Sequence, residues 1–178
     1  AKTWNIADGD ITVKGVSDES GNYNNVKQGD KDFEKDTDTV ITGESDKSTV
    51  TIDTSKGNVD VTFDDLKIDV SGKAEVDGSG KAEGDVSGKT EVDGSDDSPV
   101  DAGKAAVTVQ GDHDATIELD GKNELKSGSK NAGLEKNERE SKGTLTIKDD
   151  KGKDGSLTAE GGEGGAGIGG GAERTGSN

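Results

Sequence analysis

The chain has 178 residues and a formal net charge of −17, and only 30 of its residues are Leu, Ile, Val or Phe. That share lies below the roughly 20 % under which a highly charged chain is expected to be disordered, and 29 glycines interrupt any helical apolar stripe. No run approaches the about 18 apolar residues of a membrane span, and the scattered lysines form no run that would attract a nucleic acid. Composition therefore leaves disorder or a glycine-rich all-β fold, without membrane insertion of this segment and without a nucleic-acid partner.

Short runs in which apolar and polar residues alternate follow one another along the chain, separated by Gly, Asp, Asn and Ser. Such alternation is typical of half-buried strands. Trp4, which alternates with Ile6, is expected to cap the N-terminal end of the fold, and Phe63 is expected to face the core. In chain order the predicted strands are 4–6, 11–14, 39–42, 49–53, 59–63, 66–70, 106–109, 115–119, 124–126, 143–147 and 156–159.

The apolar clusters recur at intervals of about 7 to 10 residues, which favours stacked coils over hairpins. In a solenoid each coil contributes one or two inward side chains per strand, and the neighbouring coil covers them. A narrow shared core of this kind needs little aliphatic volume. The sequence therefore predicts a right-handed parallel β-helix as one domain over residues 1–178.

Residues 70–104 differ from the rest, because Val70–Ser79 returns almost unchanged as Val86–Ser95. The segment is rich in Gly, Asp and Lys and has no Leu, Ile or aromatic residue. It is predicted to be an insertion or loop within the solenoid, with thin additional coils as the alternative.

Four stretches of the chain resemble bacterial carbohydrate-binding-type surface domains, which occur in large secreted proteins of Firmicutes; they are Asp60–Asp69, Ala115–Gly128, Asn131–Glu135 and Gly155–Gly171. The resemblance implies a right-handed parallel β-helix that is exported, often as part of a longer adhesin. Some proteins of this kind are similar to polygalacturonate binders that use calcium. An extracellular or bacterial cell-surface location, in a Gram-positive organism, follows as an expectation. A start at Ala1 without a signal peptide predicts a processed mature segment.

Candidate site residues are aspartates and one tyrosine. Calcium takes about six to eight oxygen ligands, and Asp64–Asp65, in a predicted turn between two strands, and Asp112 and Asp114 are the candidate ligands. Aspartates at turns also bond local N–H groups, so a purely turn-forming role stays open. Tyr23, in a predicted open polar loop, is the candidate for stacking on a sugar or docking a protein, with a loop tether as the alternative.

The sequence predicts no catalytic activity. It has one histidine and no cysteine, so a usual zinc site cannot form, and it contains no Gly-x-Ser-x-Gly nucleophile elbow. The expected function is a non-catalytic binding or adhesion module for a polysaccharide, with calcium bridging an anionic one. The alternatives are an adhesin that binds a host glycoprotein or other protein (mucin, receptor or immunoglobulin) through the insertion, and a structural stalk without ligand.

Overall fold

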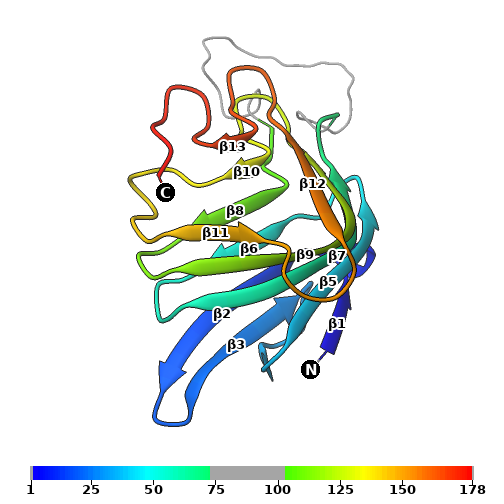
Figure 1. The fold of residues 1–178 in the computed structure, drawn as a ribbon. Helices are drawn as coiled ribbons and strands as arrows, with labels where there is room; N and C mark the ends of the chain where they lie inside the picture. Colours follow the sequence, from blue (N-terminus) through cyan, green and yellow to red (C-terminus); the bar gives the residue numbers. More distant parts are fainter. Residues whose placement is uncertain (1, 73–102, 178) are drawn as a thin grey trace.

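The computed structural model describes residues 2–72 and 103–177, which form two β-sheets (Figure 1). The first, sheet A, is parallel throughout and runs in the order β1-β5-β7-β9-β11, with β12 also paired to β9. Its strands are β1 (Lys2–Asn5), β5 (Thr39–Ser45), β7 (Val59–Asp69), β9 (Ala115–Lys126), β11 (Leu145–Lys148) and β12 (Gly155–Glu160).

The second sheet, sheet B, is mixed and runs in the order β13-β10-β8-β6-β2-β3-β4. Pairing is parallel from β13 to β2 and antiparallel from β2 through β3 to β4. A 3₁₀ turn, η1 (Ile6–Asp8), leads from β1 of sheet A into this sheet. The strands of sheet B are β2 (Ile11–Asp18), β3 (Gly21–Gln28), β4 (Glu34–Asp36), β6 (Val50–Asp53), β8 (Val107–Gln110), β10 (Leu134–Glu135) and β13 (Ile168–Gly169).

One hydrophobic cluster joins the two sheets. Alternate side chains of each strand enter it, as the period of two along a strand requires. Phe63 and Ile117 contribute from sheet A, and Val13 and Ile52 contribute from sheet B; all four are fully buried. Trp4 is also buried, and its Nε1 donates a hydrogen bond to Asp36 Oδ2 at 2.8 Å. The expectation that Phe63 faces the core is confirmed.

The predicted right-handed parallel β-helix is wrong. The strands form one parallel and one mixed sheet, and no closed solenoid is present among residues 2–72 and 103–177. The decisive departure is at β3, since the sequence predicts an open polar loop around Tyr23 where the structure has this strand. Asp18 Oδ1 accepts hydrogen bonds from Ser20 N and Ser20 Oγ, at 2.8 and 2.6 Å, which closes a tight turn. The chain therefore reverses, and β3 pairs antiparallel with β2 instead of continuing into a coil.

A second departure lies in sheet A, where extra residues accumulate at one place on successive strands. Between the same two consecutive paired positions, β5 runs two residues (42 to 44), β7 runs three (64 to 67) and β9 runs four (120 to 124). Each strand thus holds one residue more at this place than the strand before it. On the other side of β9, residue 118 pairs with 148 of β11 and residue 121 pairs with 155 of β12. The extra residues on that side form the loop 149–154. That loop separates β11 from β12, which consequently lie end to end along β9.

The predicted insertion at 70–104 lies outside the described residues, apart from 70–72 and 103–104. The described residues contain no helix that is both long and apolar enough to cross a membrane.

Candidate functional site

Aromatic and basic side chains gather on the outer face of the antiparallel strands of sheet B. The alternation along β2 and β3 buries Val13, Asn24 and Val26 and turns the residues between them outward. The register pairs Lys14 with Asn25, and Asn25 with Lys35 of β4. We call the resulting surface the hairpin face; it consists of Lys14, Tyr23, Lys27, Phe33 and Lys35.

The lysines of the hairpin face lie over its aromatic rings. Lys35 Nζ is 4.3 Å from the centre of the Tyr23 ring, while Lys14 Nζ and Lys27 Nζ are 5.6 and 5.9 Å from that of Phe33. These distances are within the about 6 Å over which a cation and a ring face attract. None of the three ammonium groups forms an ion pair with another described residue. Phe33 is 45 % exposed, so a flat apolar ring reaches solvent beside the ammonium groups of Lys14 and Lys27.

Tyr23, a predicted ligand contact, is thus on strand β3 and not in an open loop. Its hydroxyl donates to Asp18 Oδ2 at 3.1 Å, and this bond to a carboxylate raises the pKa of the tyrosine. The hydrogen bonds that Ser20 donates lower the pKa of Asp18, so its carboxylate stays charged and holds the ring in place. Tyr23 is therefore preorganised, a property that reduces the entropy lost on binding.

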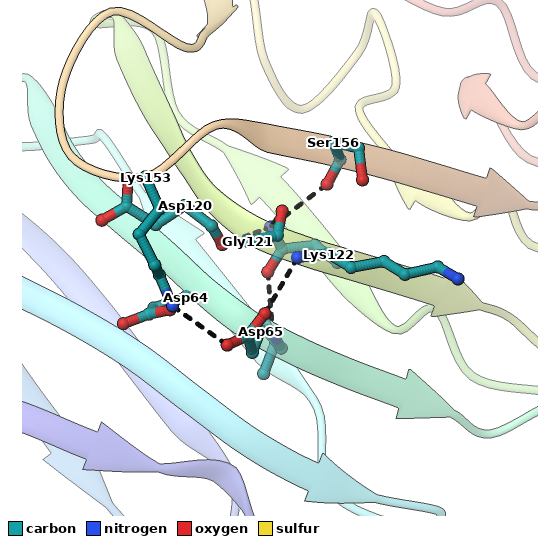
Figure 2. Close-up of polar contacts among 9 residues, drawn as sticks. Asp64, Asp65, Asp120, Gly121, Lys122, Lys153 and Ser156 are labelled. Atoms are coloured by element: carbon teal, nitrogen blue, oxygen red, sulfur yellow. Dashed lines mark hydrogen bonds and ion pairs between the residues drawn. The ribbon is translucent and has the colours of Figure 1, made fainter.

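Asp64 and Asp65 lie at the point in sheet A where the extra residues accumulate, within the continuous strand β7 rather than in a turn (Figure 2). Asp65 has a left-handed backbone (φ 51°), which aspartate tolerates better than most residues. Its Oδ1 accepts a hydrogen bond from Lys122 N on β9 at 2.9 Å. The opposite residue is Gly121, where a Cβ would clash with the Asp65 carboxylate.

A lysine from the loop 149–154 lies over these aspartates. Lys153 Nζ is 2.8 Å from Asp64 Oδ1 and 3.1 Å from Asp65 Oδ2 (Figure 2). The pKa of Lys153 is raised mainly by its bond to Asp64 and secondly by its bond to Asp65. The pKa of Asp65 is lowered mainly by the Lys122 N–H and secondly by Lys153. Asp120 lies in register with Asp64 on the neighbouring strand, and its buried Oδ1 has no hydrogen-bond partner among the described residues.

Asp112 and Asp114, the other predicted calcium ligands, accept hydrogen bonds from backbone amides in the segment that precedes β11. Asp112 Oδ1 accepts from Lys142 N at 3.1 Å, and Asp114 Oδ1 accepts from Thr144 N at 2.9 Å. Asp10 Oδ1 does the same for Thr49 N at 2.9 Å. Within the described residues no group of three or more His, Cys, Asp or Glu side chains is placed to hold a metal ion. The calcium site remains a prediction, and the structure gives several of these acids a backbone partner instead.

A polar groove of about 410 Å³ crosses the outer face of sheet A. Its carboxylates are Asp38, Asp60 and Glu118, and its ammonium groups belong to Lys148 and Lys151. Glu118 is only 6 % exposed, and its Oε2 accepts hydrogen bonds from the backbone N–H groups of Asp150 and Lys151, both at 2.9 Å. Its Oε1 is buried and has no hydrogen-bond donor among the described residues. Glu118 cannot be recognised from the sequence, because one glutamate in an alternating strand looks like any solvated residue.

The chain was also compared with known proteins: no protein-family model, no curated protein and no solved structure matches it.

Proposed function

We propose that this chain is a non-catalytic binding module of a secreted or cell-surface bacterial protein, and that it binds an acidic polysaccharide through the hairpin face. The observation that carries the proposal is the pairing of two aromatic rings with three lysines that have no ion-pair partner among the described residues, on one surface formed by the antiparallel strands and the connection before β4. The other two aromatic side chains, Trp4 and Phe63, are buried.

The chemistry of the surface fits a charged sugar polymer. Aromatic rings offer flat apolar area against the faces of sugar rings, and ammonium groups complement carboxylates or sulfates. In a chain of net charge −17, positive groups concentrated on one face steer an anionic ligand to that face and away from the remaining surface. A preformed sheet also loses little entropy when it binds an extended chain.

Calcium does not enter this proposal. The predicted bridging role of calcium requires carboxylates on the protein opposite those of the ligand, whereas the hairpin face presents lysines. Direct pairing between ammonium and carboxylate groups supplies the same charge neutralisation without a metal ion.

The test is isothermal titration calorimetry with oligogalacturonate and with uncharged dextran fragments of similar length. Two double variants are compared, Lys14→Gln/Lys27→Gln on the hairpin face and the matched control Lys67→Gln/Lys126→Gln on sheet A. Because each exposed ion pair contributes up to about 1 kcal/mol, we expect about tenfold weaker oligogalacturonate binding in the first variant. The control is expected to bind like the unchanged protein.

A separate variant tests the Phe33 ring. Phe33→Ala removes stacking area without touching a hydrogen bond that the structure records, and is expected to weaken binding about fivefold. Equal losses in the hairpin-face and control variants would refute the assignment of the site. Absence of oligogalacturonate binding would refute the proposed function and favour the structural stalk, and binding only to a host glycoprotein would favour the adhesin.

A further inference from the structure

We propose that the hairpin face has two unequal halves, and that its ligand is a polysaccharide in which acidic and neutral sugars alternate. The half around Phe33 takes an acidic sugar, and the half around Tyr23 takes a neutral one. Because it concerns the same surface, this assignment rests on the proposed function and narrows the class of polysaccharide that binds there. The two halves differ in how positive and negative groups are placed beside their rings.

The two halves lie toward opposite ends of the outward side of β3. Tyr23, Asn25 and Lys27 alternate with buried residues along this strand, so all three point outward. At the usual rise of a strand, Tyr23 and Lys27 are about 13 Å apart along β3. Asn25, between them, is in register with Lys14 of β2 and with Lys35 of β4. A chain of several sugars laid along β3 therefore contacts both halves at once.

The half around Phe33 is positive. Lys14 Nζ and Lys27 Nζ lie 5.6 and 5.9 Å from the centre of the Phe33 ring, and neither forms an ion pair within the described part of the chain. Asp53 of β6 is in register with Lys14, but its Oδ1 accepts a hydrogen bond from Ser55 N at 2.9 Å. An acidic sugar can place its ring on the exposed Phe33 ring and its carboxylate against the two ammonium groups.

The half around Tyr23 carries charges of both signs. Lys35 Nζ lies 4.3 Å from the centre of the tyrosine ring, and the tyrosine hydroxyl donates to Asp18 Oδ2 at 3.1 Å. The hydrogen bonds that Ser20 donates, and to a smaller extent attraction by Lys35, lower the pKa of Asp18 below its ordinary value, so this carboxylate is charged at neutral pH. The charge of Lys35 is therefore offset by a nearby carboxylate, which sets this half apart from the one around Phe33.

The mixed charges beside Tyr23 select a neutral sugar. A carboxylate placed there would be drawn to Lys35 but would also face Asp18, and a like-charge contact costs binding free energy. The hydroxyls of a neutral sugar avoid this conflict, because each can donate to the Asp18 carboxylate or accept from Lys35 Nζ. A polymer with an acid on every sugar meets the repulsion in any position along β3, whereas one in which acidic and neutral sugars alternate does not.

The experiment compares two acidic polymers by isothermal titration calorimetry. Hyaluronan fragments alternate glucuronate with neutral N-acetylglucosamine, whereas oligogalacturonate with the same number of sugars carries an acid on every sugar. We expect the hyaluronan fragments to bind the unchanged protein about fivefold more tightly, which is the size of one exposed charge–charge contact. Attraction by net charge alone would give the opposite order, because the hyaluronan fragments carry half the charge.

One variant and a matched control locate this selectivity. Asp18→Asn removes the negative charge beside Tyr23 but keeps an oxygen for the Ser20 N–H. We expect oligogalacturonate to bind this variant about fivefold more tightly than the unchanged protein, and hyaluronan fragments to bind it no more tightly than before. The control is Asp69→Asn, because Asp69 Oδ1 accepts the same two hydrogen bonds from Ser71 at the end of β7 in sheet A. It is expected to leave both affinities unchanged.

Two results would overturn the inference and leave the proposed function standing. They are an affinity for oligogalacturonate that equals or exceeds that for hyaluronan fragments, and an equal effect of Asp18→Asn and Asp69→Asn on oligogalacturonate binding. In both cases Lys14→Gln/Lys27→Gln would still weaken the binding that is measured. Binding of neither polymer, or binding that Lys14→Gln/Lys27→Gln leaves unchanged, would refute the proposed function and this inference with it.

Discussion

Asn123 is expected to be the residue on which the bulged part of sheet A depends most. It is fully buried on β9, its Oδ1 accepts from Leu66 N at 2.7 Å, and its Nδ2 donates to Asp120 O at 3.1 Å and Ser156 O at 3.2 Å. One amide therefore joins β7, β9 and β12 where the register shifts. Among the described residues, Asn123 Oδ1 is the only side-chain acceptor of the Leu66 N–H.

Asn123→Ala would leave this buried N–H without a partner, at a cost of about 1–3 kcal/mol, and would release two carbonyls that lose about 1 kcal/mol between them. We expect the free energy of unfolding to fall by about 2–4 kcal/mol. For a chain of this length the melting temperature would fall by roughly 5–15 °C. The assay is urea unfolding followed by the fluorescence of Trp4, the sole tryptophan, which is 5 % exposed.

Asn58→Ala is the matched control for Asn123→Ala. Asn58 is exposed and accepts one hydrogen bond, from Asp114 N at 2.9 Å, so its loss is expected to cost about 1 kcal/mol or less. A loss below about 1 kcal/mol for Asn123→Ala, or equal losses for the two variants, would refute the reasoning that the buried amide holds the three strands together.

Three further predictions concern pH, packing and calcium. Burial opposes the charge of Asp36, but Trp4 Nε1–H and other donors keep its pKa below the ordinary 3.8; its stabilisation is therefore present above that value and is lost as the pH falls through the folded-state pKa. Asp36→Asn should flatten the acid limb of a stability–pH curve, and an unchanged limb would count against this. Gly143→Ala would push a Cβ into the backbone carbonyl of His113, so a melting temperature well below that of the unchanged protein is expected by calorimetry, and an unchanged one would show that the contact yields easily. Calcium and EDTA should give the same melting temperature, because Lys153 already forms an ion pair with each of the two aspartates beside it; a higher melting temperature with calcium would support the predicted metal site.

The sequence predicts strands where one face is buried, and little else. The runs 59–63 and 66–70 were found because Val59, Val61, Phe63, Leu66 and Ile68 alternate with polar residues, and they are indeed buried. The bulge that joins the two runs into the single strand β7 was not predicted. It depends on Asn123 and Lys122, which lie more than fifty residues away along the chain.

The hairpin was missed for a different reason. Strand β3 carries Asn24 at an inward position, so its alternation is invisible to a rule that counts apolar residues. Asn24 is tolerated there because its Nδ2 donates to Thr39 Oγ1 at 3.0 Å and to Asp60 O at 2.8 Å. The lysines of the hairpin face come from three different strands, so no stretch of sequence shows them as a patch. Tyr23 was singled out as a ligand contact only from its polar neighbours.

Several carboxylates accept hydrogen bonds from backbone amides of other strands or loops, among them Asp10, Asp65, Asp114 and Glu118. These bonds affect how the protein behaves in salt. Dissolved ions screen separated charges but compete weakly with a short bond between a carboxylate and a fixed N–H. The lysines of the hairpin face, by contrast, would meet a charged polymer across a wet surface. If the hairpin face binds an acidic polysaccharide as proposed, concentrated salt should release the polysaccharide without unfolding the two sheets.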